Sequence, residues 1–195
     1  MKQLKLETLK KWMVFILPFI ILGVTSCNQA QEKATSNATI KAPSSTIHAA
    51  TFMGNAKDVN QHIAANTDLN EKDAYGSTPL HIAATFDKTD IAILLIEGGA
   101  NVNKTDANGS TPLHTAAFFG RIDIVKALLE NNADISIRNS YNSTALESVS
   151  SSFDDVKPIY DQLSKDLGPF GLKLDYSKLK VDRTVITELI NARIN

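Results

Sequence analysis

The sequence predicts an all-α fold of the solenoid type, built from stacked helical repeats. The first observation is an eight-residue motif that returns after 33 positions, from Ser77–Ala84 to Ser110–Ala117, with one substitution. The second is that altered copies stand one further period away on each side, at 44–50 and 143–149. The third is that the apolar segment after each motif repeats with the same spacing. A fixed period of this length is typical of stacked units that bury their apolar faces against one another.

Each unit is expected to contain a helix, a tight turn, a second helix and an extended finger. Pro79 follows a threonine, and proline at the first helical position lacks only a donor that would be unpaired there, while threonine can cap the helix. The apolar segment 91–103, which returns at 124–136, predicts the second helix of the unit. Asp73-Ala74-Tyr75-Gly76 predicts the turn of a finger, because aspartate bonds locally and glycine permits the turn.

The motif Thr-Pro-Leu-His-x-Ala at 78–83, repeated at 111–116, resembles the signature of the ankyrin repeat family. The resemblance covers about half of the chain. It implies an ankyrin-repeat solenoid of helix-turn-helix units with β-hairpin-like fingers. We expect four units, of which the outer two are degenerate, within a domain of residues 44–195: about 44–72, 73–105, 106–138 and 139–195.

The last unit departs from the repeat after Ser152. An extra helix is predicted by an apolar stripe, and Asp154 or Asp155 is expected to cap it. The stripe consists of Val156, Ile159, Tyr160, Leu163 and Leu167. The second helix of the unit is then expected at about 183–194, with Asp182 or Thr184 near its start, so that an insert spans about 154–181. Such an insert either shields the open end of the stack or adds a contact surface.

Residues 1–26 have the composition of a lipoprotein signal peptide. A lysine-rich start precedes an apolar run from Trp12 to Val24, which is shorter than the about 20 residues of a membrane span. Val24-Thr25-Ser26-Cys27 resembles the bacterial lipobox, which implies lipidation of Cys27; an ordinary secretory leader is the alternative. Residues 27–43 have the composition of a flexible polar tether. We therefore expect a lipid-anchored protein of the bacterial cell envelope, facing the periplasm or the exterior, with the outer membrane favoured if the host has one.

Charge and motifs exclude several function classes. Removing residues 1–26 takes away four of 20 basic and one of 21 acidic side chains, which leaves a net charge of −4. No basic stripe is present, so nucleic acid is not an expected partner. We find no phosphate-binding glycine loop, no Cys-x-x-Cys and no set of residues that converges on catalysis. The sequence predicts no enzyme, no cofactor and no metal site.

Three histidines recur at the repeat period, but they do not predict a metal ladder. Equivalent positions of stacked units lie about 10 Å apart, whereas zinc needs its ligand nitrogens within about 2.1 Å of one ion. The resemblance implies a structural role instead, in which His48, His81 and His114 bond backbone and the threonine of the motif. His62 lies outside the motif and is expected on the surface.

Ankyrin-type proteins bind through finger tips and the exposed side of the first helix of each unit, and this implies a set of partner-binding residues. The alignment places four phenylalanines on one concave strip, flanked by tyrosines at the finger tips. Aromatic residues and arginine are enriched in interface hot spots. Alternatively, some of these rings pack inside the helical layers. The candidates are Phe52, Met53, Tyr75, Phe86, Phe118, Phe119, Arg138 and Tyr141.

These features together predict a non-catalytic protein-protein interaction module that is anchored to a membrane and presents a concave surface to one or more envelope proteins. The alternative is an accessory or immunity factor for an envelope enzyme or toxin, for example in oxidative-stress defence.

Overall fold

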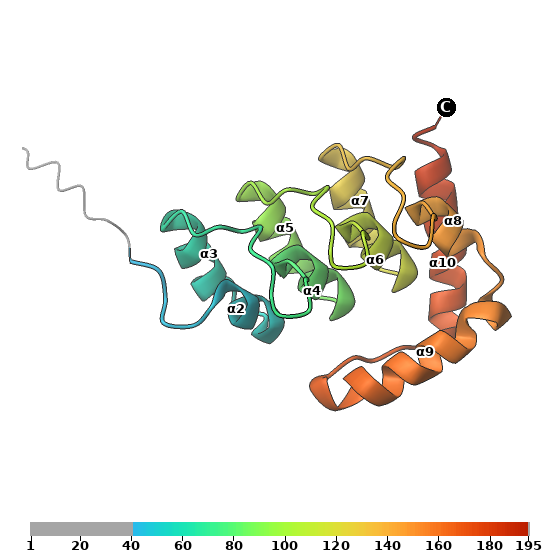
Figure 1. The fold of residues 1–195 in the computed structure, drawn as a ribbon, viewed down its shortest axis with the longest axis horizontal. Coiled ribbons are helices and arrows are strands. Elements are labelled where there is room, and N and C mark those ends of the chain that lie inside the picture. The colour runs from blue at the N-terminus through green and yellow to red at the C-terminus, as the bar shows by residue number, and fades with distance from the viewer. Residues whose placement is uncertain (1–40, 195) are drawn as a thin grey trace, which may run out of the picture. The chain divides into compact units, whose positions relative to one another are not determined.

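The structure is a computed structural model that describes residues 41–194 of the 195-residue chain. The expected signal peptide, Cys27 and most of the expected tether lie outside the described residues. Within this range the elements are all helices (Figure 1). They are α2 (Ile47–Met53), α3 (Ala56–Ala64), α4 (Pro79–Thr85), α5 (Thr89–Glu97), α6 (Pro112–Phe118), α7 (Ile122–Glu130), α8 (Ala145–Ser150), α9 (Phe153–Leu167), the 3-10 turn η1 (Gly168–Phe170) and α10 (Tyr176–Asn191).

The helices form two layers, and this arrangement confirms the predicted all-α solenoid. One layer contains α2, α4, α6 and α8, in which each helix packs on the next. The other layer contains α3, α5, α7 and α10 in the same order. The core between the layers consists of repeat positions, such as Leu80 and Leu113 of the first layer and Leu95 and Leu128 of the second, each at most 1% exposed. Burying one such side chain contributes about 1.5–3 kcal/mol, so the period of 33 specifies the stack.

Threonines begin the first-layer helices. Thr46, Thr111 and Thr144 are N-cap residues whose side-chain oxygen accepts a hydrogen bond from the backbone N–H three residues on, at 3.1 to 3.4 Å. In the degenerate fourth unit, Glu147 takes the place of the histidine, and its carboxylate accepts from the Thr144 N–H at 2.9 Å. A reciprocal capping box therefore keeps the helix start after the motif has lost its proline and histidine.

The fingers are tight turns, and residues 41–194 contain no β-strand. In the first finger, Asp73 N–H donates to the Ser77 carbonyl at 2.9 Å, and Asp73 Oδ1 accepts from the Tyr75 and Ser77 N–H groups. The next finger repeats these bonds from Asp106. The expected β-hairpin-like pairing is thus reduced to two backbone bonds within each turn, because an aspartate side chain accepts from the donors that a strand partner would otherwise bond.

The fourth unit carries its extra helix between α8 and α10. Helix α10 packs on α7 and α8 and buries Ile186 and Ile190, so it occupies the second-layer position expected for 183–194. Its start was predicted wrongly. The helix begins at Tyr176, where Asp175 Oδ1 accepts from two backbone N–H groups, and the expected cap residue Asp182 lies inside it, 8% exposed. The buried Leu179 extends the apolar stripe and explains the longer helix.

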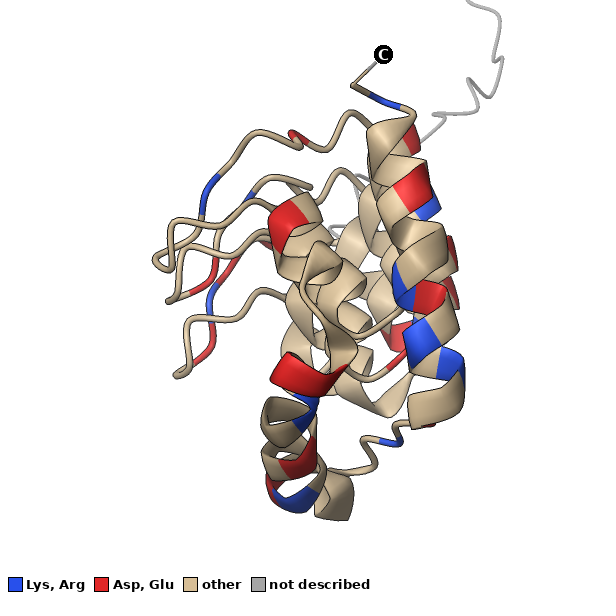
Figure 2. Cartoon of the chain, turned by 90° about the vertical axis from the view of Figure 1, so that its right-hand side faces the viewer, with Lys and Arg blue, Asp and Glu red and all other residues tan. Residues whose placement is uncertain are grey.

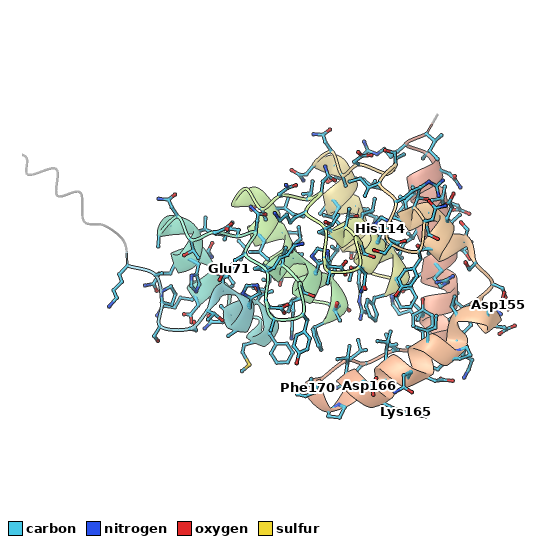
Figure 3. The ribbon with its side chains drawn as sticks, in the orientation of Figure 1. Glu71, His114, Asp155, Lys165, Asp166 and Phe170 are labelled. Carbon is cyan, nitrogen blue, oxygen red and sulfur yellow. The ribbon has the colours of Figure 1, made fainter. Side chains whose placement is uncertain are left out.

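Helix α9 begins at Phe153, before both expected cap residues, and follows Ser152, whose side chain makes no capping bond. Asp154 and Asp155 lie in its first turn, where negative charge is favourable, but they do not cap it. The helix ends at Leu167, and the turn η1 and Gly171, with φ +100°, follow it. Figure 3 labels Asp155 near the start of this helix and Lys165, Asp166 and Phe170 near its other end.

Candidate functional site

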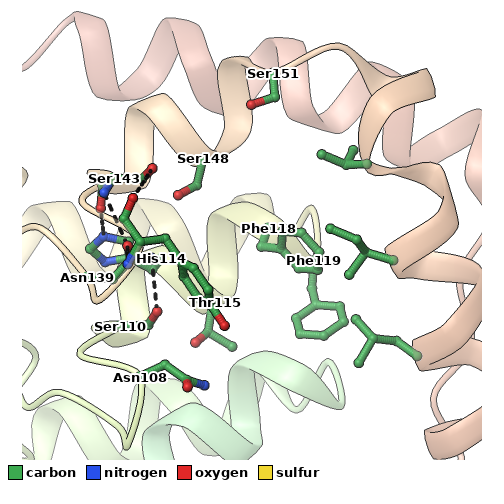
Figure 4. A pocket seen from close by; sticks show the side chains of 14 residues that line it. Asn108, Ser110, His114, Thr115, Phe118, Phe119, Asn139, Ser143, Ser148 and Ser151 are labelled. Carbon is green, nitrogen blue, oxygen red and sulfur yellow. Dashed lines mark hydrogen bonds between the residues drawn. The ribbon is translucent and has the colours of Figure 1, made fainter.

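A groove of about 490 Å³ separates α9 from the first-layer helices α6 and α8 and the neighbouring fingers. Figure 4 shows α9 as one wall and the ankyrin-type units as the other. No charged side chain lines the groove: its apolar part comes from both walls and its polar part from hydroxyl and amide groups. The lining residues are Asn108, Ser110, His114, Thr115, Phe118, Phe119, Asn139, Tyr141, Ser143, Ser148, Ser151, Val156, Ile159 and Leu163.

The α9 wall contributes the apolar stripe that the sequence contains. Val156, Ile159 and Leu163 follow one another at helical spacing and all line the groove. Ile159 is 51% exposed, although an isoleucine gains most from complete burial. Opposite, Tyr141 at a finger tip is 75% exposed. The groove therefore presents apolar surface that the described chain itself does not cover.

Helix α9 is fixed to the repeats through Tyr160, its only buried residue. The ring of Tyr160 lies 4.6 Å from that of Phe118. Its hydroxyl donates to the Phe118 carbonyl at 2.6 Å and accepts from Nη1 of Arg183 at 2.9 Å. Nη2 of Arg183 donates to the Ser151 carbonyl at 2.8 Å. Burial raises the pKa of Tyr160, so this hydroxyl keeps its proton and the bond to Phe118. The link sets the position of one groove wall.

The polar floor of the groove is a structural network around His114. Its Nδ1 lies 2.8 Å from the Thr111 hydroxyl, and its Nε2 lies 3.0 Å from the Ser143 carbonyl of the next unit. Burial lowers the pKa of His114, and it lowers that of His81, which makes the same two contacts one unit earlier. Both rings are therefore neutral at pH 7. The hydroxyl-histidine pairs are closed to substrates, because Thr78 and Thr111 are 1% exposed. His81 and His114 thus make the bonds to backbone and to the motif threonine that were expected of them.

His48 and His62 differ from this pattern. Nε2 of His48 bonds the Glu71 carbonyl at 2.9 Å, not a carbonyl before the next threonine motif. The surface position expected for His62 is wrong: it is 3% exposed, with Nδ1 at 3.1 Å from the Thr67 hydroxyl and Nε2 at 2.9 Å from the Ser45 carbonyl. It takes the place of an apolar core residue and closes the first unit against the chain that precedes it.

The structure separates the predicted partner-binding residues into two groups. Phe118, Phe119 and Tyr141 line the groove. Phe52 and Phe86 lie in the first two units, half-buried, with their rings in edge-to-face contact at 4.8 Å. Two further candidates are strongly exposed outside the groove: Met53 at 73% and Tyr75 at 85%.

Two of the predicted residues are engaged within the chain. Phe119 is 7% exposed, so its expected place on an open strip is wrong: its ring packs edge-to-face on Phe118, and the guanidinium of Arg121 lies 5.9 Å from its centre. Arg138 is exposed, but it forms a bidentate pair with Glu147 at 2.7 and 2.9 Å. Its pKa is raised, first of all by the hydrogen bond to Glu147.

Residues 41–194 contain no group of three or more histidine, cysteine, aspartate or glutamate side chains that could hold a metal ion. None of the described helices is long and apolar enough to cross a membrane.

Comparison with known proteins agrees with the geometry. Residues 47–139 match the family model for ankyrin repeats (three copies). No curated protein matches the chain. Ankyrin repeats are in general protein–protein interaction modules and are typically non-catalytic. Residues 47–139, which contain α2 to α7, therefore consist of ankyrin repeats, and their helices stack in two layers.

Proposed function

We propose that this protein is a non-catalytic binding protein that takes a segment of a protein partner into the groove between α9 and the repeats. The observation that carries the proposal is the uncovered apolar lining on both walls, from Ile159 on α9 to Tyr141 on the finger. Exposed apolar surface that gathers in one place usually marks a contact site. Three apolar residues of the wall helix, Val156, Ile159 and Leu163, line the groove instead of a packed core.

The lining also describes what such a partner segment would present. Charged side chains are absent from it, and His114 is neutral. Hydroxyl and amide groups of Ser110, Asn139 and Ser148 stand beside the aromatic rings. An uncharged segment with one or two large apolar side chains fits this surface, and each such side chain contributes about 1.5–3 kcal/mol when it is fully buried. The walls are already positioned by Tyr160, so binding requires little ordering.

The proposed place of action is the bacterial cell envelope. In this proposal residues 1–26 are a signal peptide, lipidated Cys27 begins a tether that reaches to about residue 43, and residues 44–195 are presented in the periplasm or outside. The support is the sequence pattern alone. Incorporation of a labelled fatty acid into the wild-type chain, and its loss in Cys27→Ser, tests the anchor. Unchanged labelling of the variant would refute it.

The groove is tested by cross-linked capture from the native envelope, with a tagged protein that begins after the tether. The perturbed variant combines Tyr141→Ser and Ile159→Ser, because both side chains are more than half exposed and their loss leaves the core intact. Phe170→Ser is the matched control, since Phe170 is 64% exposed but lies outside the groove lining. A protein captured by the wild type and the control but lost by the double variant supports the groove. Equal capture by all three would place the contact elsewhere.

A further inference from the structure

A second cavity, of about 270 Å³, lies where α8, the start of α9 and α10 meet. Two cations line it, Lys180 and Arg183, and no acidic side chain does. Four residues with hydroxyl groups also line it, Ser150, Ser151, Thr184 and Thr187, and each hydroxyl donates to the backbone carbonyl four residues earlier. Acidic and basic residues are otherwise interspersed along α9 and α10 (Figure 2). The cavity thus has positive charge and no acidic side chain in a chain whose surface has mixed charge.

Arg183 is the unusual member of this set because it is buried without an anionic partner. It is 3% exposed, and both hydrogen bonds that it donates go to neutral oxygens, those of Tyr160 and Ser151. Among the described residues no carboxylate lies within 4 Å of its guanidinium, whereas Arg121 and Arg138 each have one. A buried charge is costly unless it is paired. The electrostatic balance of this site is therefore incomplete in the isolated chain.

Arg183 keeps N–H groups that no described residue accepts from. A guanidinium has five N–H groups, and two are used here. Nε has no hydrogen-bond partner among the described residues and is not fully enclosed, and Arg183 lines this cavity. A guanidinium edge that is held in place by two bonds and free on the other side suits an oxyanion.

The start of α9 adds donors at the edge of the same cavity. Ser151 and Phe153, on either side of the N-cap residue, both line it. Ser152 makes no side-chain capping bond, so the first N–H groups of this 15-residue helix have no side-chain acceptor there. Free N–H groups at the start of a helix, together with the helix dipole, favour an anion.

We propose that this cavity binds a small oxyanion, a phosphate or a carboxylate group, between Arg183, Lys180 and the start of α9. The anion completes the pairing of Arg183 and thereby strengthens the junction that holds α9 on the stack. The site is separate from the groove, with which it shares only Ser151. The proposed anion binding can therefore be tested independently of the proposed partner binding.

The test follows the Arg183 Nε–H resonance by ¹⁵N-edited NMR while inorganic phosphate is added to the protein, with sodium chloride at matched ionic strength as the salt control. We expect a saturable shift with phosphate and an increase in the unfolding temperature, neither of which chloride reproduces. Lys180→Gln is expected to weaken phosphate binding roughly tenfold, because it removes one charge-assisted contact and leaves the Tyr160 link intact. Lys165→Gln, an equal charge change near the far end of α9, should leave it unchanged.

A parallel titration with acetate, and with a short blocked peptide that ends in a free carboxylate, distinguishes the sources of the anion. Tighter binding of phosphate assigns the site to a free phosphate or phosphoryl group, and tighter binding of the peptide assigns it to a chain end. If none of these anions gives a saturable shift beyond that of chloride, or if the two lysine variants behave alike, the site is refuted. Arg183→Lys, which keeps the charge but loses the planar fork, should abolish the preference for oxyanions over chloride.

Discussion

Removing one hydroxyl group, in Tyr160→Phe, is expected to release α9 from the repeats while the stack stays folded. The ring remains, so its contacts with Phe118 and with Phe153, 5.9 Å away, are kept. What is lost is the oxygen that joins α6, α9 and α10, as donor to the Phe118 carbonyl and acceptor from Arg183. The variant therefore isolates the polar link from the packing of the ring.

The magnitude follows from the groups left behind. A hydrogen bond to a charged donor contributes about 1.5–3 kcal/mol, and an enclosed carbonyl without a partner costs about 1–3 kcal/mol, with some relief from water. We expect the opening free energy of α9 to fall by about 2–4 kcal/mol, which is a rise of about 30-fold to several-hundred-fold in its opening equilibrium. Amide hydrogen exchange measures this directly, because exchange in α9 should accelerate by that factor while α4 to α7 keep their protection.

Tyr176→Phe is the matched control. Its hydroxyl donates to Asp161 at 2.8 Å. This contact joins α9 to the first residue of α10 and does not reach the repeats, and both residues are partly exposed. We expect a loss of only about 0.5–1.5 kcal/mol. If Tyr160→Phe leaves exchange in α9 unchanged, or if both variants have the same effect, the link does not position this wall. Loss of protection throughout the stack would show that the Tyr160 hydroxyl supports the core instead.

Three further predictions concern the repeats. The Thr51 hydroxyl is enclosed without a partner, so Thr51→Val should stabilise the protein by about 1 kcal/mol or more, and a lower urea midpoint would contradict this. Burial lowers the pKa of His81 and His114 below the ordinary value of 6.5, so the unfolded chain binds protons more readily than the folded one. Their contribution to stability is therefore complete above about pH 6.5 and is lost as the pH falls below that value. A urea midpoint at about pH 5.5 that equals or exceeds the midpoint at about pH 7 would refute the assignment of neutral rings. Gly76 and Gly99 both have positive φ, +78° and +91°, but an added Cβ would lie 2.7 Å from the next finger at Gly76 and in free space at Gly99. Calorimetry should therefore find a loss of stability of about 1 kcal/mol for Gly99→Ala, and about 1–3 kcal/mol more for Gly76→Ala.

The repeat itself could be predicted from the sequence because its determinants are local and periodic. The capping threonines, the turn aspartates and the bonds of His81 and His114 all follow from one motif and the same motif one unit on. His62 was misplaced because it was considered apart from the repeat. Its counterparts one and two periods later are the core residues Leu95 and Leu128, so the period places it in the core, where the Thr67 hydroxyl and the Ser45 carbonyl bond its ring nitrogens.

The candidate site was only partly predictable, because its walls come from segments without a shared period. The stripe Val156, Ile159 and Leu163 was recognised as helical, but helical spacing does not say what a stripe faces. The contact that places it joins Tyr160 to Phe118, 42 residues apart. The predicted exposure of Phe119 was wrong because its contacts, too, come from segments that share no period. It is adjacent to Phe118, and the Arg121 side chain that lies beside its ring is itself anchored by Asp87 and the carbonyls of the previous unit.

The insert was expected either to shield the open end of the stack or to add a contact surface, and the burial of its helix α9 distinguishes these roles. The second helix of the unit already closes the stack, since Ile186 and Ile190 of α10 are fully buried against the last repeat. Helix α9 buries one residue, Tyr160, and leaves Ile159 half exposed at the groove. A helix that only had to cover the stack would bury its apolar stripe, since each such residue contributes about 1.5–3 kcal/mol. The stripe of α9 is held across from the repeats instead of on them, and this favours the contact surface.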